Sequence, residues 1–501
     1  MIVDQRRRRT AATWGLLLAI VIVGGGLRLY RIGAKSIWLD EAASLELARR
    51  PFFDLVRECA RRDTHPPLYY TLLHVWLGGS QAAGRARALS ALFGVATIAA
   101  LYALARRLLP RLPSLVAALV LAVSAYQVYF AQEARHYALT TLLVVVSWYL
   151  LIVLLQREGR GWGLWLCLAL VNAAGLYTFY YHAFSIAAQL VVLGLLWRDG
   201  GRRLVLRWCV WHLVPAALFA FYLPVVFGHI RKLDRLAPTA RPGAMTLEEL
   251  AKTGAQFAAG FLVEMREVAG RPSGALRLGL AVLVLAALGL ALAGLKRRRV
   301  AVLTVLGWLV VPLASAAVFP FKGHIYEPKH LVFLSPLVAL LPAIALTSLP
   351  RWWKTPAGAI VVVLVGANAW SLALWYAPGT EKENWRLAAL RLAENARQGD
   401  VLVLSPPYVH MPFAYHYQPE RLGRPCPRLE LREARPVGEP FRGTPPLGRR
   451  VWVLQCRSNV SMPNPRVFEV LEPYPRVFHE QYRHLVGTID LMLYDTRQAE
   501  P

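Results

Sequence analysis

The chain has 501 residues, of which 56% are hydrophobic, and its formal net charge is +27. The mean hydropathy of +0.39 reflects repeated apolar runs that are long enough to cross a bilayer, which excludes an ordinary soluble domain. A large positive charge can indicate nucleic acid, but most basic residues here lie in short clusters between the apolar runs, where they orient helices in a membrane. We therefore expect no nucleic-acid partner.

The first apolar run, residues 12–30, follows four arginines at positions 6–9. No A-x-A-like cleavage site follows this run and many apolar runs come later, so a first transmembrane helix is favoured over a cleaved signal peptide. The positive-inside rule then places the N-terminus in the cytoplasm and residues 31–85 in a first outer loop.

Within this loop, residues 65–77 form a short apolar segment with two histidines and two tyrosines. Counting the segment as a span would place the basic cluster at Arg106 and Arg107 outside and would invert every later loop. We therefore predict a helix that lies in the outer interface, with its aromatic residues at the level of the lipid headgroups.

Ten further spans follow when the basic clusters are kept on the inner side. Five inner loops then each carry at least two basic residues, which a random assignment rarely gives, and residues 229–273 form a long outer segment. The predicted fold is mainly α-helical, a membrane bundle of about eleven spans in residues 1–376. The predicted spans are 12–30, 87–109, 112–130, 137–155, 162–180, 183–197, 208–227, 276–295, 300–319, 331–349 and 356–375.

The C-terminal part, residues 377–501, has a different character. Residues 381–396 are charged with helical spacing, 401–404 and 451–454 are short apolar runs typical of β-strands, and 485–494 alternates less cleanly. We predict a small outer α/β domain here.

Five cysteines are present without a CxxC pair, so neither a zinc site nor a thiol redox motif is indicated. Cys426 and Cys456 both fall in the C-terminal domain, where an oxidising compartment would permit a disulfide. The sequence leaves open whether these two residues are bridged or are free thiols.

Charged residues that do not follow the positive-inside trend gather on the predicted outer side, near the ends of the spans. The first group, Trp38-Leu39-Asp40-Glu41, comes shortly after the first span. One of its two carboxylates is a candidate general base. A solvated loop is the alternative interpretation of this group alone.

The second and third groups lie near later spans. His65 precedes two prolines that make the entry to the interfacial helix rigid, and a hydrogen-bonded structural histidine is the alternative. Glu133 and Arg135 lie in a very short turn between the third and fourth spans, just before Tyr137. Charges at such a depth are costly unless they are paired or used, so the alternative here is a mutual salt bridge.

The fourth group lies between the ninth and tenth spans and brings two lysines and two histidines to the outer side. Such cations suit a phosphate held at the membrane surface, and His182, between the fifth and sixth spans, adds an imidazole on the same side. The group contains Lys322, His324, Glu327, Lys329 and His330.

These groups and their order resemble the integral-membrane glycosyltransferases of the GT-C class, in particular the family 39-like group with protein O-mannosyltransferases and lipid A aminoarabinose transferases. The resemblance covers nearly the whole chain. In that family the Asp of the first-loop acidic motif is the catalytic carboxylate, which corresponds to Asp40 with Glu41 beside it. The family's second acidic position corresponds to Glu133.

Two of the matching motifs depart from the family pattern. The family's Pro-Pro-Leu-Tyr-Tyr segment matches residues 66–70, but many relatives have Lys where this chain has His65. The family's late Pro-Arg-Tyr-Leu motif matches residues 328–331, which keep a positive charge at Lys329 but lack the Arg and the Tyr. The stretch at residues 384–386 resembles the start of the family's outer domain.

The resemblance implies a polyprenyl-phosphate-linked sugar donor and a single inverting displacement, in which Asp40 takes the proton of the acceptor hydroxyl. Glu41 and Glu133 are assigned to catalysis beside it. The resemblance leaves a divalent cation open, and the same two glutamates are the candidate ligands. The residues assigned to the donor phosphate are His65, Arg135, Lys322, Lys329 and His330, and those assigned to substrates are Trp38, Tyr69, Tyr137, His182, His324 and Glu327.

The implied location is the inner cell membrane, with the active site and the C-terminal domain outside the cytoplasm. The implied partners are membrane lipids, the lipid-linked donor, and an acceptor that is a glycan, a lipid or a protein. A transporter or flippase of envelope lipids or glycans is the competing class, but it would predict ionisable residues near the mid-plane and inverted repeats. A scaffold role would leave the outer acidic motifs unexplained.

Overall fold

The computed structural model describes residues 2–61, 65–197, 201–236, 246–318, 327–350, 352, 354–433, 448–458, 466–485 and 487–497. The chain packs into two compact units, and neither unit is continuous in sequence. The helical unit contains Met1–Gly33, Leu47–Arg266 and Pro272–Trp375, and the α/β unit contains Ala34–Glu46, Glu267–Arg271 and Tyr376–Pro501.

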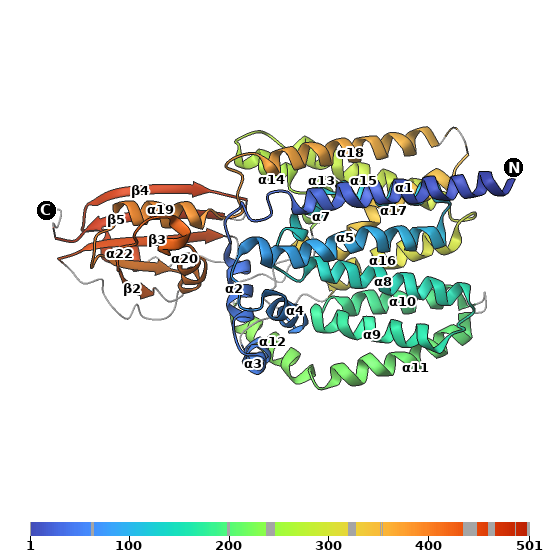
Figure 1. Cartoon of the computed structure of the whole chain (residues 1–501), viewed down its shortest axis with the longest axis horizontal. Coiled ribbons are helices and arrows are strands. Elements are labelled where there is room, and N and C mark those ends of the chain that lie inside the picture. Colours follow the sequence, from blue (N-terminus) through green and yellow to red (C-terminus); the bar gives the residue numbers. More distant parts are fainter. Residues whose placement is uncertain are drawn as a thin grey trace. The chain divides into compact units, whose positions relative to one another are not determined.

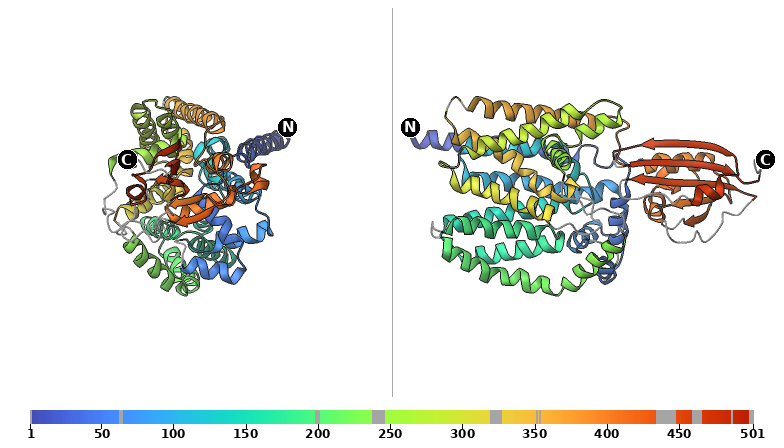
Figure 2. Two further views of the ribbon diagram at one scale, coloured as in Figure 1. Left: turned by 90° about the vertical axis from the view of Figure 1, so that its left-hand side faces the viewer. Right: turned by 180° about the vertical axis from the view of Figure 1, so that it is seen from behind.

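The helical unit is a bundle of roughly parallel helices, with α3 and α4 at the end opposite the start of α1 (Figures 1 and 2). Its elements are α1 (Ile2–Leu29), α3 (Phe52–Arg61), α4 (Leu68–Leu77), α5 (Ala83–Leu108), α6 (Arg111–Val123), α7 (Ala125–Ala131), α8 (Tyr137–Gln156), α9 (Trp162–Thr178), α10 (His182–Leu195), α11 (Gly201–Ala220), α12 (Leu223–Leu236), α13 (Leu247–Ala259), α14 (Leu262–Val268), α15 (Gly274–Leu292), α16 (Arg299–Val318), the 3-10 helix η2 (Pro328–Leu334), α17 (Pro336–Ser348) and α18 (Lys354–Tyr376).

Eight helices among the described residues are long and apolar enough to cross a membrane, and a ninth span results when α6 and α7, bent by 55°, are taken together. Helices α9 and α10 are shorter, with 17 and 14 residues, and correspond to the predicted fifth and sixth spans. Ten of the eleven predicted spans match these apolar helices to within a few residues. The seventh, 208–227, is displaced, because α11 begins at Gly201 and ends at Ala220 and the predicted span runs into α12. The predicted multi-pass helical bundle is confirmed. The eight long helices are α1, α5, α8, α11, α15, α16, η2 continued by α17, and α18.

The bend between α6 and α7 is held by polar side chains of two other helices. The Arg28 side chain, fully buried in α1, donates to the carbonyls of Ala122 at 2.9 Å and Leu121 at 3.2 Å. From α18, the Asn368 amide oxygen accepts from the Ala125 N–H at 2.7 Å. Backbone groups that a break removes from the helix ladder need such partners in an apolar interior, so the bend is a built feature that sets the direction of α7.

The α/β unit contains a five-stranded sheet with strand order β2-β1-β3-β5-β4. The first three strands in that order are parallel, whereas β5 pairs antiparallel with both β3 and β4. Helices cover both faces, so the central strands are buried on both sides. The elements are α19 (Trp385–Asn395), β1 (Val401–Ser405), η4 (Pro407–Val409), α20 (His410–His416), α21 (Pro419–Leu422), β2 (Glu430–Glu433), β3 (Arg450–Ser458), α22 (Arg466–Leu471), β4 (Arg476–Arg483) and β5 (Gly487–Asp495), and α2 (Leu39–Ala48) begins in this unit.

Candidate functional site

The turn between α7 and α8 carries three charged or titratable side chains that are all buried. Glu133 has no exposed surface, and Arg135 and His136 are 5% and 1% exposed. The Arg135 guanidinium donates a hydrogen bond to the Tyr70 hydroxyl at 2.9 Å, and Ser90 Oγ donates to the Arg135 carbonyl at 3.2 Å. A buried cation is tolerated only with such partners, so α4 and α5 fix the position of Arg135.

Aromatic rings enclose His136 in this turn. The ring centroid of His65 lies 4.6 Å from that of His136, and the ring of Phe179 lies 4.7 Å from His136. Neither ring nitrogen of His136 has a hydrogen-bond partner within the described part of the chain. Leaving a buried polar group unpaired costs free energy, and such a group calls for an explanation, of which a bound ligand is one.

Positive charge gathers around the same ring. Burial lowers the pKa of His136 well below its ordinary value, and the neighbouring groups His65, Arg135, His330 and Lys329 lower this pKa further. These four neighbours are all among the residues that the sequence assigned to the donor phosphate. The structure thus brings them together, although they come from widely separated parts of the chain, while Lys322 falls outside the described residues.

Lys329 and His330 are fixed by the first turn of η2. Lys329 Nζ forms a salt bridge with Glu327 Oε2 at 2.7 Å, and both side chains are partly exposed. The Glu327 N–H donates to His330 Nδ1 at 3.4 Å, and the His330 ring lies 5.8 Å from that of Tyr181. The substrate candidate Glu327 therefore sits beside the cationic cluster as the partner of one of its members, and His324 lies outside the described residues.

Three other substrate candidates are packed inside the helical unit. Tyr69 is fully buried, and its hydroxyl shares a hydrogen bond with Ser90 Oγ at 2.9 Å. Tyr137 is 2% exposed and its ring lies 4.4 Å from His136. His182 is also fully buried, with Nε2 at 3.0 Å from the side-chain oxygen of Asn172.

The acidic motif lies in the α/β unit, at the start of α2. Asp40 is partly exposed, whereas Glu41 and Trp38 are buried. Both carboxylates occupy the first turn of α2, where the helix dipole favours negative charge. The Trp38 ring faces Lys382 Nζ, which lies 5.6 Å from the ring centroid.

Residues of the C-terminal region hold this acidic segment. The Leu39 N–H donates to Glu383 Oε2 at 3.1 Å, and the Ser36 N–H donates to Glu381 Oε2 at 3.0 Å. The His416 imidazole lies 3.1 Å from the Ile37 N–H. The backbone just before Asp40 is thereby fixed by two glutamates and a histidine, none of which the sequence analysis identified as functional.

The described residues include no group of three or more His, Cys, Asp or Glu side chains that could hold a metal ion. Cys426 and Cys456 are both free thiols in this structure. Burial raises the pKa of each thiol above its ordinary value.

Comparison with known proteins relates this architecture to membrane glycosyltransferases. Residues 64–227 match the family model of dolichyl-phosphate-mannose-protein mannosyltransferases. No curated protein matches the chain.

Solved structures share the fold. The oligosaccharyltransferase of Archaeoglobus fulgidus, in complex with Zn and sulfate, is 11% identical with a TM-score of 0.55, covering 96% of this chain and 73% of that one. ArnT from Cupriavidus metallidurans in the apo state is 13% identical with a TM-score of 0.55, covering 96% and 98% of the two chains. The same protein bound to undecaprenyl phosphate is 12% identical with a TM-score of 0.51, covering 95% and 98%. The resemblance to the GT-C class is confirmed at the level of the fold.

Proposed function

We propose that this protein is a GT-C glycosyltransferase that moves a sugar from a polyprenyl-phosphate-linked donor to an acceptor hydroxyl. The observation that carries the proposal is the set of ring contacts that joins the cationic residues to the buried turn at Arg135 and His136. The His65 ring lies 4.6 Å from that of His136. The His330 ring, next to Lys329 in the chain, is linked to His136 through the rings of Tyr181 and Phe179. Three of these residues, His65, Arg135 and His136, fall within the segment that matches the mannosyltransferase family model. ArnT, which has the same fold, has been solved with undecaprenyl phosphate bound.

The cationic cluster has the chemistry that a lipid-phosphate leaving group requires. Departure of a phosphate is assisted by fixed positive charges that neutralise the charge developing on its oxygens. The Arg135 guanidinium supplies several hydrogen-bond donors in a planar fork. Lys329 supplies a compact positive charge, and its ammonium leaves the salt bridge with Glu327 to pair with the phosphate. His65 and His330 line the remaining sides of the same cluster.

Asp40 is the proposed general base, because it is the partly exposed carboxylate of the acidic motif whereas Glu41 is fully buried. The bond between the anomeric carbon and the phosphate oxygen breaks as the acceptor oxygen attacks, and the acceptor proton passes to Asp40. One carboxylate is sufficient for this single displacement, since the lipid phosphate leaves without a general acid, and inversion at the anomeric carbon follows. No step is assigned to a metal ion.

The orientation is part of the proposal. Basic residues of four loops meet at the end of the bundle where α5 and α8 end and α11 and α16 begin. The positive-inside rule assigns that end to the cytoplasm, which puts the turn that carries Arg135 and His136 on the outer side of the cell membrane.

The test is sugar transfer by the purified full-length protein in detergent, with a panel of radiolabelled polyprenyl-phosphate hexoses and pentoses. We expect one donor to be consumed with release of polyprenyl phosphate, and Asp40→Asn to lower this rate by about 100-fold or more because the base is lost. Glu394→Gln, which changes an exposed carboxylate of α19, is the matched control and should keep the wild-type rate. Consumption of no donor by the wild type, together with no binding of polyprenyl phosphate, would contradict the proposal.

A further inference from the structure

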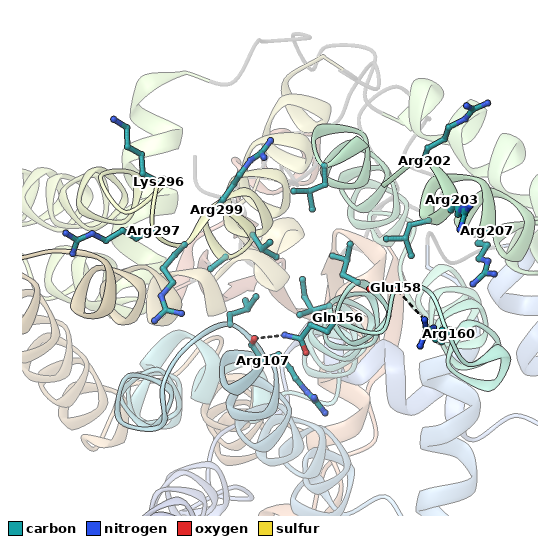
Figure 3. A pocket seen from close by; sticks show the side chains of 18 residues that line it. Arg107, Gln156, Glu158, Arg160, Arg202, Arg203, Arg207, Lys296, Arg297 and Arg299 are labelled. Carbon is teal, nitrogen blue, oxygen red and sulfur yellow. Dashed lines mark hydrogen bonds and ion pairs between the residues drawn. The ribbon is translucent and has the colours of Figure 1, made fainter. Parts of the chain in front are cut away.

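A basic cavity opens at the end of the helical unit far from α3 and α4. It has a volume of about 1000 Å³ and lies among the end of α5, the α8–α9 turn, the start of α11 and the α15–α16 turn (Figure 3). Among the described residues, its lining contains nine basic side chains and a single acidic one, Glu158. The basic residues are Arg107, Arg160, Arg202, Arg203, Arg207, Lys296, Arg297, Arg298 and Arg299.

Some of these cations have structural partners. Arg207 donates to the Gly159 carbonyl at 2.7 Å, Arg160 pairs with Glu158 at 3.5 Å, and Arg107 donates to the Tyr149 hydroxyl at 3.3 Å. These three arginines therefore have a structural role within the helical unit.

Four other basic residues of the lining differ from these. The side chains of Arg202, Arg203, Lys296 and Arg298 form no hydrogen bond or ion pair with the described part of the chain. Lys296 and Arg298 lie in the α15–α16 turn, whereas Arg202 and Arg203 lie in the first turn of α11. Figure 3 shows Arg202, Arg203 and Lys296 around the cavity. Like charges that surround one hollow repel one another, and a bound anion would relieve this repulsion.

The floor of the cavity has the opposite character. Beneath the basic rim lie the apolar side chains of Leu108, Leu196, Leu204 and Ile152. A soluble anion gains nothing from an apolar floor, whereas an amphiphile places its phosphate among the cations and its glycerol and first methylene groups on such a surface.

A second, smaller hollow adjoins this one. It has a volume of about 410 Å³ and is lined by the apolar residues Leu112, Val116 and Leu346 together with Lys354 and Arg298. Arg298 lines both hollows, so a cation of the large cavity also borders a mainly apolar hollow. An apolar hollow beside several cations suits the acyl chains of a lipid whose headgroup carries more than one negative charge.

We propose that the basic cavity is a binding site for an anionic phospholipid that carries two phosphates, with one phosphate at the start of α11 and the other at the α15–α16 turn. The helices α11 and α16 begin at this cavity, and the N-terminus of a helix favours phosphate. The positive-inside rule explains why basic residues are frequent in these loops, but it requires neither a concave rim nor an apolar floor.

The experiment uses the full-length protein in nanodiscs of zwitterionic phospholipid that contain a low fraction of cardiolipin, a phospholipid with two phosphates. Lipids retained after gentle release into detergent are counted by native mass spectrometry. We expect the wild type to retain cardiolipin, and Arg202→Gln/Arg203→Gln/Lys296→Gln/Arg298→Gln to retain it roughly tenfold less, since each cation near a lipid phosphate contributes to binding. The double variant Arg203→Gln/Arg298→Gln should fall between the two.

The matched control is Arg111→Gln/Arg157→Gln, which has the same charge change as the double variant at exposed arginines of neighbouring loops that do not line the cavity. It should retain cardiolipin like the wild type. Equal loss in the control and in the double variant would show general surface attraction and would overturn the proposal. Soluble pyrophosphate is added as a competitor at a concentration that leaves cardiolipin bound elsewhere on the protein. If it displaced cardiolipin from this cavity, the occupant would be a free diphosphate, and the lipid assignment would be overturned.

Discussion

At the scale of single residues, the cations of the candidate site are held by hydrogen bonds and ion pairs to neighbouring side chains, Arg135 by Tyr70 and Lys329 by Glu327. Arg135 and Lys329 can be recognised in the sequence, because they are basic residues on the predicted outer side and oppose the positive-inside trend. His136 does not stand out, because its importance arises from ring contacts with residues 65 and 179 that only the folded chain creates. Tyr70, the hydrogen-bond partner of Arg135, was likewise missed, although it lies in the motif next to Tyr69.

The lowered pKa of His136 predicts a specific pH dependence of stability. The folded protein keeps this ring neutral below its ordinary pKa of 6.5, whereas the unfolded chain takes up a proton there. Stability is therefore lost as the pH falls from about 6.5 towards the folded pKa, by at most about 1.4 kcal/mol per pH unit for this one group. Thermal unfolding in detergent between pH 7 and pH 5 should show a smaller loss for His136→Asn than for the wild type.

The exposed His410 of α20 offers the control for this titration. His410→Asn should follow the wild-type pH dependence, because this variant keeps the buried ring of His136. Polyprenyl phosphate, as an anion beside His136, should reduce the acid loss in the wild type but not in His136→Asn. An unchanged slope in His136→Asn would show that other groups carry the acid sensitivity.

At the scale of elements, hydrophobic runs predicted the spans well, because the hydrocarbon core imposes a length and a composition. What they could not predict was the break at Ser124, since it depends on Arg28 and Asn368 of distant helices. The helices of residues 229–273 were also missed. A capping box at Thr246 and Glu249 marks the start of α13 and was a readable signal.

Among the strands, the sequence likewise predicted some and missed others. The central strands β1 and β3 have continuous apolar runs because helices cover both faces of the sheet, and these runs were predicted. The edge strands β2 and β4 have largely exposed or alternating side chains. Short polar strands of this kind have no pattern that distinguishes them from loops.

The packing of α9 against α10 gives a prediction at this scale. A Cβ atom built at Gly175 of α9 would lie 2.4 Å from the ring of His182, and that ring is also fixed by its contact with Asn172. Gly175→Ala should therefore lower the free energy of unfolding by about 1–3 kcal/mol, as measured by thermal unfolding in detergent. Gly163→Ala in the same helix meets nothing within 4 Å and should be neutral or slightly stabilising. Equal stability of the two variants would show that the His182 ring moves freely.

At the scale of the whole molecule, segments far apart in sequence form one unit. Residues 34–46, which carry the acidic motif, pack with residues 376–501. The C-terminal region therefore does more than follow the membrane spans, since its first residues fix the backbone next to the proposed base. Sequence reasoning could not pair the two segments, because more than three hundred residues separate Leu39 from Glu383 and no local pattern links them.

Glu383 is the residue through which this pairing should act on the reaction. Its Oε2 accepts hydrogen bonds from the Leu39 N–H at 3.1 Å and from the Trp385 indole at 2.6 Å, and the side chain is buried. We expect Glu383→Ala to lower kcat by roughly 10- to 100-fold with little change in the KM for the donor, because a small displacement of Asp40 costs more in the transition state than in binding. Steady-state transfer assays with the donor that the panel of polyprenyl-phosphate sugars identifies would measure both constants.

Glu383→Gln separates positioning from charge. The glutamine carbonyl oxygen can accept both hydrogen bonds, so this variant should recover most of the kcat lost in Glu383→Ala. Glu394→Ala removes exposed ion pairs of α19 with Arg391 and Arg424, and such pairs contribute little, so it should keep both constants. A Glu383→Gln variant as slow as Glu383→Ala would mean that the negative charge itself acts on the reaction. A Glu383→Ala variant with normal kcat would mean that the acidic segment reaches its working position without the C-terminal region.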